Sequence, residues 1–454
     1  MKNDKIVVVD NGAATIKLGI LQGKGKITSR IIQNAIVRPK SDKTTYVGRE
    51  IDNCRDFSSL HYRLPFEKGY LVDWDAEKAI WDDLFTSQYL GFAPTEASLL
   101  ITEPYFNLPS LQEVYDQFVF EEYEFQAYHR CAPAALIPHS QLFSEQATPA
   151  PECMLVVDAG FSFTHVVPIM NGAIVWRAVK RIDVGGKLLT NQLKELVSYR
   201  QWNMMDETYV MNDVKESCCY VSTDFRRDLE ICRENPKKNP IVREYILPDF
   251  STNRQGRIRS ADEPPNDSHQ ILFMNNERFT VPELLFRPDD IGLEQAGLAT
   301  AIAHSISLLP EELRGLFWAN IGLIGGTTKF PSFRERLSAE LRSVAPVDCD
   351  VEIHQSSDPI MEAFNGAMVF AGQPDFKDYV VTRAEYLEMG SSACRRKFKD
   401  WKPSEEAKGK ETTRGKASTK AMDETDDGDE VTPPRRGRGR GRGGAGGNPT
   451  RRRA

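Results

Sequence analysis

The chain has 454 residues, of which 40% are hydrophobic and 27% are charged, so it can bury an apolar core of ordinary size. Its formal net charge is −7, but residues 399–454 hold 15 Lys and Arg against 10 Asp and Glu, which leaves −12 for the first 398 residues. A body this acidic excludes a main domain that binds nucleic acid broadly through its own charge. The sequence also predicts no membrane span and no secretory signal, because no apolar run approaches the length that a bilayer requires.

The first predicted element is a β-hairpin. Residues 6–12 combine a β-branched run, typical of a buried strand, with a tight Asp-Asn-Gly turn, and residues 15–20 resume the apolar pattern. The same order returns at residues 154–160 and 163–169, where an Asp-Ala-Gly turn separates the two apolar segments. Two copies about 150 residues apart predict a duplicated α/β domain with one hairpin in each half.

Helices are expected between and after the hairpins, because apolar residues recur there at helical spacing. The predicted helical ranges are 75–85, 110–123, 294–308 and 332–344. The eight cysteines are scattered, and neither they nor the seven histidines have the spacing of a zinc site. We therefore expect reduced, mostly buried thiols, as in cytosolic and nuclear proteins.

Two segments depart from the globular pattern. Residues 251–269 are polar and contain a Pro-Pro pair, which predicts a surface insertion loop that either docks a partner or DNA or is idle. From residue 399 the chain is of low complexity, with an acidic run at 423–430 followed by Arg-Gly repeats. Such a tail cannot bury enough apolar surface to offset its ordering entropy, so we expect disorder over residues 399–454. The predicted domain is therefore residues 1–398.

The paired turns have a chemistry of their own. A tight Asp-x-Gly turn after a buried strand directs several backbone N–H groups into one space, where a phosphate can bind. Asp10 and Asp158 are suited to hold the hydration shell of Mg²⁺, and Lys17 can reach a phosphate as a point charge. A third Gly-rich segment, residues 321–328, places a Gly-Gly turn before a helix N-terminus. Each signal alone is also typical of a plain turn, but together they predict a nucleotide cleft.

Several stretches of the sequence resemble actin, in the same order along the chain. They are residues 7–20 (VVVDNGAATIKLGI), 63–85 (RLPFEKGYLVDWDAEKAIWDDLF), 322–333 (GLIGGTTKFPSF) and 381–398 (VTRAEYLEMGSSACRRKF). The similarity extends from about residue 6 to residue 398. The resemblance implies the α/β actin fold, in which duplicated RNase H-like domains form two lobes and four subdomains around a nucleotide cleft.

Within the actin family, residues 120–125, 199–216 and 245–250 resemble a nuclear class of actin-related proteins. That resemblance implies a non-catalytic subunit of a SWR-type chromatin remodelling complex, which exchanges a histone variant into nucleosomes. The implied partners are a large remodeller ATPase motor subunit, a zinc-finger HIT-type subunit and the nucleosome with its histones. The implied location is the nucleus, with some cytoplasmic protein.

The resemblance also carries over a possible nucleotide site. Lys215 and Glu216 match a Lys-Glu pair that flanks adenine and ribose in actin, although such a pair is also typical of an exposed helix. ATP or ADP with Mg²⁺ is implied as a structural ligand, with Asp10 and Asp158 holding the metal through water. The full set of implied nucleotide-binding residues is Asp10, Asn11, Gly12, Lys17, Asp158, Gly160, Lys215, Glu216, Gly325, Gly326 and Thr327.

The sequence departs from actin where hydrolysis would occur. Ala13 stands in place of the serine that meets the γ-phosphate, and Pro133 stands in place of the glutamine that orients the attacking water. Phe161 replaces a second aspartate, and we expect it to cap an apolar core. Because phosphoryl transfer depends on positioning and electrostatics, these changes predict a chain that is not an enzyme. Lys329 and Pro359 also replace actin's adenine-side residues.

Filament formation is not expected either. In actin the loop before the Tyr-Val-Gly landmark inserts into the next subunit. Here that loop consists only of residues 40–45, which is too short to extend into a neighbouring subunit. The alternatives are a nucleotide-hydrolysing actin-like ATPase, a small-molecule phosphotransferase of the same superfold, or a cytoskeletal filament protein. The basic end of the tail is open to three interpretations: DNA contact through phosphates, a nuclear-import signal or a solubilising segment.

Overall fold

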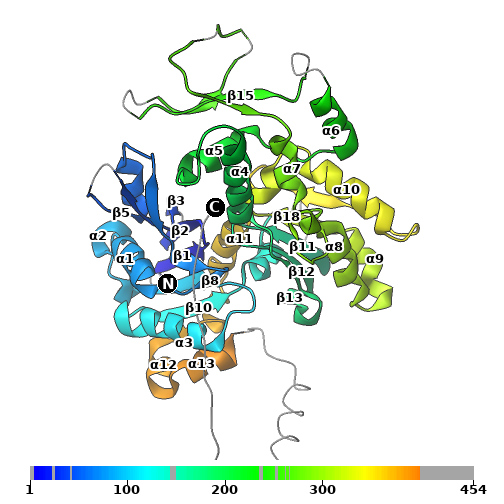
Figure 1. The fold of residues 1–454 in the computed structure, drawn as a ribbon. Coiled ribbons are helices and arrows are strands. Elements are labelled where there is room, and N and C mark those ends of the chain that lie inside the picture. The colour runs from blue at the N-terminus through cyan, green and yellow to red at the C-terminus, as the bar shows by residue number, and fades with distance from the viewer. Residues whose placement is uncertain are drawn as a thin grey trace, which may run out of the picture. The chain divides into compact units, whose positions relative to one another are not determined.

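The computed structural model describes residues 5–22, 26–40, 43–143, 150–234, 239–250, 254–260, 262–264 and 266–398. Within these ranges the chain forms two lobes, each built on a large sheet with smaller sheets and helices around it (Figure 1). The predicted tail, residues 399–454, lies outside the described residues. None of the described helices is long and apolar enough to span a bilayer.

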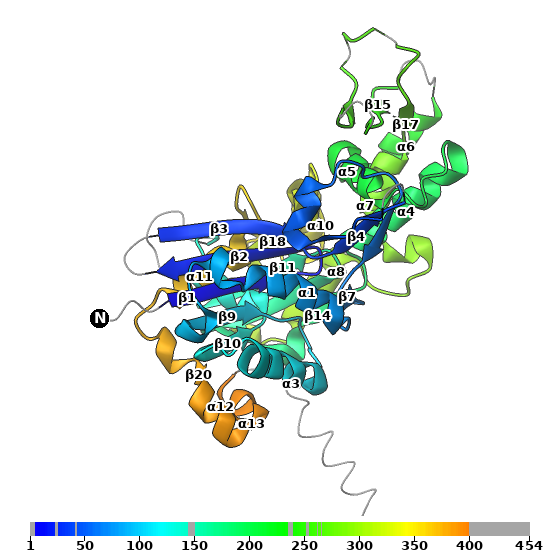
Figure 2. The same ribbon diagram turned by 90° about the vertical axis from the view of Figure 1, so that its left-hand side faces the viewer.

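The first lobe contains a six-stranded sheet in the order β20-β10-β9-β1-β2-β3, and β1, β2 and β3 lie side by side in Figure 2. Two small sheets, β5-β4-β6 and β7-β8, complete this lobe. Its strands are β1 (Lys5–Asn11), β2 (Thr15–Gln22), β3 (Lys26–Gln33), β4 (Ile36–Pro39), β5 (Tyr46–Val47), β6 (Leu60–Arg63), β7 (Phe66–Glu67), β8 (Tyr70–Leu71), β9 (Ala97–Thr102), β10 (Ala127–Cys131) and β20 (Val381–Thr382). Its helices are α1 (Trp74–Leu84), α2 (Ser87–Leu90), α3 (Pro109–Gln117), α11 (Glu362–Ala371), α12 (Arg383–Met389) and α13 (Ser391–Lys397).

The second lobe contains a sheet in the order β13-β12-β11-β18-β19, with β14 pairing β12, and a small sheet, β16-β15-β17. Its strands are β11 (Cys153–Ala159), β12 (Thr164–Met170), β13 (Ala173–Ile174), β14 (Lys180–Ile182), β15 (Arg243–Ile246), β16 (Arg257–Ile258), β17 (Ile271–Met274), β18 (Ile321–Ile324) and β19 (Ile353–Gln355). Its helices are α4 (Gly186–Arg200), α5 (Thr208–Cys218), α6 (Phe225–Arg233), α7 (Glu277–Glu283), α8 (Leu298–Ser307), α9 (Arg314–Trp318) and α10 (Phe333–Val344).

The predicted internal repeat is confirmed by the pairing of the strands. In the first lobe β1 pairs β2 antiparallel and β9 parallel, and in the second lobe β11 pairs β12 antiparallel and β18 parallel. The two hairpins also share a register, because Asp10 lies opposite Lys17 and Asp158 lies opposite His165. The two turns therefore have the same length and stand at the same place in their sheets.

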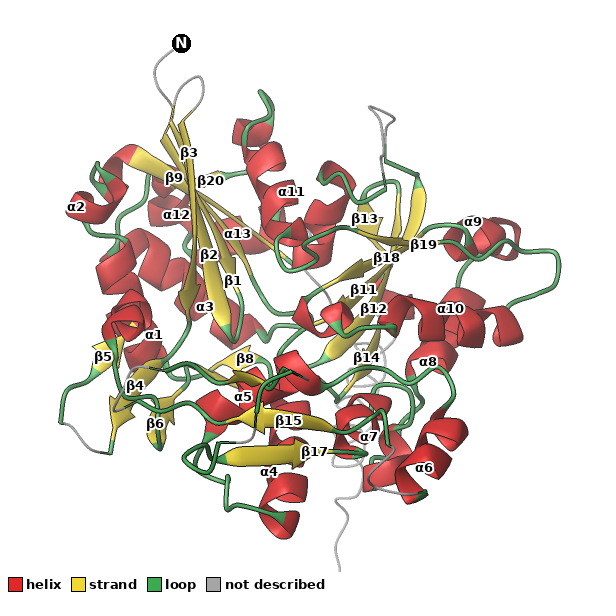
Figure 3. Cartoon of the chain, turned by 90° about the horizontal axis from the view of Figure 1, so that it is seen from above, coloured by secondary structure: helices red, strands yellow, loops and turns green. Residues whose placement is uncertain are grey.

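Helix α11 lies between the two large sheets (Figure 3). It packs against the short 3₁₀ helix at Pro133–His139, and together they form the seam where the two lobes meet. Phe364 and Ala367 of α11 pack against Val8 of the first sheet, whereas Ala363 packs with residues of β11 and β12 in the second. The seam is apolar and buried, so it packs the two lobes, and with them the two hairpin turns, against each other.

The predicted helices all form, with shifted ends. The range 294–308 contains α8, which begins only at Leu298, and the range 110–123 ends in a π-helical turn at Phe118–Glu122. All eight cysteines are free thiols, and five of them are buried, as expected. Within the insertion loop predicted at 251–269, the described residues include one short strand: Arg257–Ile258 form β16, which satisfies its backbone groups by pairing with β15.

Candidate functional site

A cavity of about 940 Å³ lies between the two lobes and is lined by residues from both hairpin turns. All eleven residues of the sequence-predicted nucleotide site line this cavity, from Asp10 in the first turn to Thr327 after the Gly-Gly turn. Residues from the two hairpins, α5 and the end of β18 therefore border one space, as the order of the sequence signals predicts. A cavity of this volume suits a ligand of nucleotide size.

The first turn is held by a buried polar network. Asp10 accepts a hydrogen bond from Thr102 (2.8 Å) and is 3.0 Å from the Lys17 ammonium, and both side chains are nearly buried. The backbone N–H of Asn11 donates to the same Thr102 hydroxyl (2.9 Å). Asn34 donates to the Gly12 carbonyl (3.1 Å) from the opposite side. Lys17 is therefore already paired with Asp10 before any anion enters the cleft.

The second turn carries a contact that the sequence analysis missed. The Tyr105 hydroxyl donates to Asp158 Oδ2 (2.8 Å) and accepts from the backbone N–H of Ala134 (3.1 Å). Burial raises the pKa of Asp158 to about 6, partly opposed by this hydrogen bond. His165, opposite Asp158 in the hairpin, has its pKa lowered by burial to about 3, so it is neutral. The second turn thus has no cation equivalent to Lys17.

The Gly-Gly turn closes the back of the cavity. Gly325 has φ +90, and a Cβ at this position would lie 2.4 Å from the Ala159 carbonyl oxygen, so only glycine fits. Thr327 then donates to the Gly160 carbonyl (3.0 Å), which joins this turn to the second hairpin. The requirement for glycine is therefore specific to Gly325. A Cβ on Gly326 would meet only the Ile360 side chain at 3.7 Å.

The part of the cavity where the sequence predicts the nucleoside is formed by α4 and α5. Lys215 is buried, and its ammonium donates to Thr190 (2.9 Å) and Asn212 (2.8 Å), while burial lowers its pKa. Asn212 in turn donates to Glu216 (2.7 Å). Lys215 is thus part of a buried network, so it is not the exposed helix residue that the alternative interpretation required.

The residues that depart from actin also border the cavity. Ala13, Pro133 and Phe161 line it together with Lys329 and Pro359. Phe161 is half-buried and belongs to none of the apolar clusters among the described residues. The expectation that Phe161 caps an apolar core is therefore wrong, because the residue lines the cavity and lies outside these clusters. Lys329 is half-exposed and lies 3.8 Å from Asp358.

The mouth of the cleft is bridged by a clasp of four residues, Phe57 and Ser59 from the first lobe with Glu207 and Tyr209 from the second. Ser59 donates to the Glu207 carboxylate through both its backbone N–H (2.9 Å) and its hydroxyl (2.6 Å). The rings of Phe57 and Tyr209 stack with centroids 4.2 Å apart. Because Tyr209 also lines the cavity, the clasp joins the lobes directly above the candidate site.

The two aspartates of the turns are partly engaged with protein partners. Both oxygens of Asp10 are bonded, to Thr102 and Lys17, and one oxygen of Asp158 is bonded to Tyr105. No group of three or more His, Cys, Asp or Glu side chains suited to a metal occurs among the described residues. Each carboxylate oxygen has two lone pairs, so these contacts leave acceptor positions for the water shell of Mg²⁺, and the magnesium site stays a prediction.

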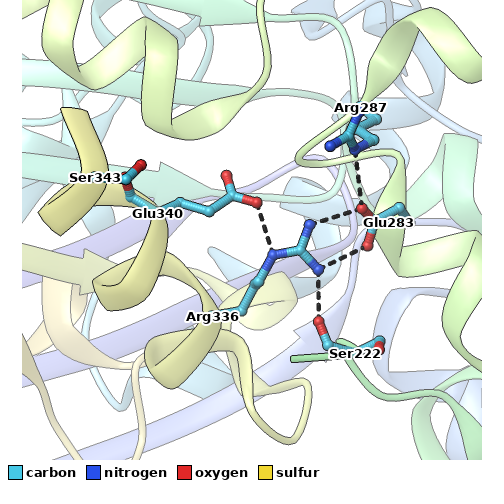
Figure 4. A network of polar contacts seen from close by, with 6 residues as sticks. All are labelled: Ser222, Glu283, Arg287, Arg336, Glu340 and Ser343. Carbon is cyan, nitrogen blue, oxygen red and sulfur yellow. Dashed lines mark hydrogen bonds and ion pairs between the residues drawn. The ribbon is translucent and has the colours of Figure 1, made fainter. Parts of the chain in front are cut away.

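A buried ion-pair network supports the second lobe from behind the cleft (Figure 4). The Arg336 guanidinium binds both oxygens of Glu283 (2.7 and 3.0 Å) and donates to the Ser222 carbonyl. Its Nε donates to Glu340 (2.7 Å) one turn along α10. The network therefore ties α10 and α7 to the segment that follows α5, the helix that carries Lys215.

The fold has two lobes, each containing a copy of the same hairpin, and a cleft between the two corresponding turns. These features define the actin class of fold. A model of the actin family matches residues 1–399, so the chain belongs to the actin family. It is 51% identical over 420 residues to the actin-like protein ARP6 of Cryptococcus neoformans, and the matched region covers 88% of this chain and 85% of that protein. It is 38% identical to the actin-related protein 6 of Drosophila melanogaster (85% and 97% covered) and 38% identical to that of Arabidopsis thaliana (87% and 99%).

Proposed function

We propose that this actin-related protein is a non-catalytic, non-polymerising subunit of a SWR-type chromatin remodelling complex. In that role it supports histone-variant exchange through contacts with a motor ATPase subunit, a zinc-finger HIT-type subunit and the nucleosome, and it acts in the nucleus. The proposal is supported by the similarity to proteins named actin-related protein 6 over most of the chain. Fold alone would leave the function open.

The observation that carries the non-catalytic part is the hydroxyl of Tyr105. It bridges Asp158 and the Ala134 N–H, next to Pro133, so these two groups are already hydrogen-bonded within the protein. Pro133 itself offers no side-chain donor or acceptor. The position that orients a water in actin is thus without a polar side chain, which makes a hydrolase or phosphotransferase the weaker candidate.

Nucleotide binding without hydrolysis remains part of the proposal. The cavity lining carries six cationic side chains against four carboxylates, a balance that favours an anionic ligand. The cations are Lys17, Arg181, Lys187, Lys194, Lys215 and Lys329, and the carboxylates are Asp10, Glu103, Asp158 and Glu216. ATP or ADP bound there would stabilise the closed form by linkage, as a structural ligand rather than a substrate.

The proposal that the chain forms no filaments rests on the short loop at residues 40–45. Its first residue, Lys40, is paired with Asp206 of the second lobe (2.7 Å). A loop that is short and anchored at one end cannot extend into a neighbouring subunit. The Arg-Gly tail would add nucleosome contact of a non-specific, salt-dependent kind.

Co-purification tests the proposed function. We expect a tagged full-length chain, recovered from nuclear extract, to bring with it a remodelling motor ATPase and a zinc-finger HIT-type protein in amounts near its own. A chain truncated after residue 398 is the matched control, and it should retain both proteins because the body carries the contacts. Recovery of the full-length chain alone, or with cytoskeletal proteins only, would refute the proposal.

A further inference from the structure

Glu77 is an ionisable residue buried behind the first turn, outside the cavity lining. It lies on α1 with 0% of its surface exposed, and its Oε1 accepts from the Asn11 side chain (2.7 Å). No Lys, Arg or His pairs with it among the described residues. A buried carboxylate without a cation is costly when charged, so the surroundings favour the neutral acid.

The acceptors around Glu77 point to the same protonation state. Of the buried polar atoms around Glu77, three oxygens and one N–H have no hydrogen-bonding partner among the described residues: Glu77 Oε2, Asn11 Oδ1, Asn34 Oδ1 and Trp81 Nε1. Burial raises the pKa of Glu77 to about 7, although the side chains of Asn11, Asn34 and Trp81 oppose this shift. An ionised Glu77 offers no donor to the two amide oxygens, whereas a protonated one supplies an O–H that an amide oxygen can accept and keeps its carbonyl oxygen for the N–H donors.

The residues that Glu77 supports are those that shape the first turn. Asn11 and Gly12 both line the cavity, Asn11 bonds to Glu77, and Asn34 holds the Gly12 carbonyl. We propose that Glu77 is a positioning residue that works as a neutral acid: its O–H holds the turn, and its ionisation loosens the turn and weakens anion binding in the cleft. The anion is the nucleotide of the proposed function, on which this part of the inference rests.

The other ionisable groups near Glu77 do not replace its proton. The phenols of Tyr115 and Tyr123 face it from α3 and from the segment after α3, and burial raises the pKa of each. Beyond Tyr115, Glu103 is paired with Arg130 at 2.6 Å. On the cleft side, Asp10 is paired with Lys17. Burial also raises the pKa of Asp116, next to Tyr115 on α3, to about 6. Glu77 differs from Asp116 in that it bonds directly to Asn11 of the turn.

The sign of the effect on stability follows from the raised pKa. The ordinary value for Glu is 4.5, so between there and about 7 the folded chain keeps a proton that the unfolded chain has lost. Stability is therefore highest at low pH in this window and falls as pH rises, by up to about tenfold in the folding equilibrium constant per pH unit. An anion bound at the turn raises the pKa further, so ligand and proton bind together.

The test compares the wild-type chain with Glu77→Gln, using Asp75→Asn on the exposed side of α1 as the charge control. Between about pH 5 and 7, the free energy of unfolding in urea should decrease more steeply with pH for the wild type and Asp75→Asn than for Glu77→Gln. The difference between the slopes should correspond to close to one proton. ADP affinity by calorimetry should fall about threefold to tenfold between pH 7 and 8 for the first two proteins, relative to Glu77→Gln. Titration of ADP and of Asp158 is common to all three and cancels.

Parallel pH profiles for wild type and Glu77→Gln in both measurements would overturn the inference. If no protein binds ADP, the nucleotide part of the proposed function fails and the linkage to ligand fails with it. The unfolding profiles then still decide whether Glu77 carries a proton beneath the turn. If ADP binds equally at every pH while the stability profiles differ, the proton is real but is not coupled to the cleft, which refutes the positioning role.

Discussion

Replacing Arg336 by methionine is expected to lower the free energy of unfolding by about 3–5 kcal/mol, because it leaves a buried carboxylate without its partner. Glu283 is fully buried, and Arg336 binds both of its oxygens. Arg287 is 3.5 Å from Glu283 but mostly exposed, so it cannot compensate in full. The change would be measured by urea unfolding followed through tryptophan fluorescence, to which the buried Trp318 of the second lobe contributes.

Two further variants separate the ion pair from a general effect of mutating α10. Arg334→Met, at an exposed position on the same helix, should change stability by less than about 0.5 kcal/mol. The double variant Arg336→Met/Glu283→Leu should recover part of the loss, because no charge is then left buried. A loss below about 1 kcal/mol for Arg336→Met would show that the network in Figure 4 does not hold the second lobe together.

Gly325→Ala is expected to destabilise the chain by about 2–4 kcal/mol, the sum of a strained backbone and an overpacked contact. At φ +90 and ψ 155 an alanine is strongly disfavoured, and its Cβ would lie 2.4 Å from the Ala159 carbonyl oxygen. The second turn would therefore have to move, and any stabilisation of the chain by nucleotide should decrease with it.

Gly326→Ala is the matched control for this change. Its Cβ would make only an ordinary contact with Ile360 at 3.7 Å, so the melting temperature should stay close to that of the wild type. The two variants are compared by thermal unfolding with and without ADP. Equal losses in both variants would indicate that the Gly-Gly turn is flexible and that the geometry at Gly325 is not required.

The sequence predicts much of this fold because its strongest signals are local. The short apolar runs before Asp10 and Asp158, each followed by a turn, favour buried strands, and their repetition predicts the duplicated sheets. The phosphate turns could be placed in one cleft for the same reason, since equivalent hairpins of a duplicated domain face each other. The ends of helices such as α8 were less predictable. Gly297 and the polar residues before it are compatible with the helical spacing of the sequence, and only the packing of the folded chain places them outside the helix.

The contacts that the sequence did not reveal are those made across the fold. Tyr105 lies 53 residues from Asp158, and in the sequence it is one of two adjacent aromatic residues in a loop. The clasp joins Ser59 to Glu207, which are 148 residues apart. Glu77 was within reach of sequence reasoning, because it stands three and four residues before Ile80 and Trp81, on the buried face of α1. A charged residue on an apolar helix face is the signal that could have identified it.

The central claim, that the cleft does not hydrolyse nucleotide, is tested most directly by single-turnover release of γ-phosphate from ATP. The purified full-length chain would be held in excess over labelled ATP, so that even slow hydrolysis by the bound fraction is counted. We predict no phosphate above the protein-free control, because Tyr105 holds Asp158 and the Ala134 N–H, and Pro133 cannot orient a water. Release at a rate comparable with that of filament-forming actin, lost in a Lys17→Ala variant, would contradict it.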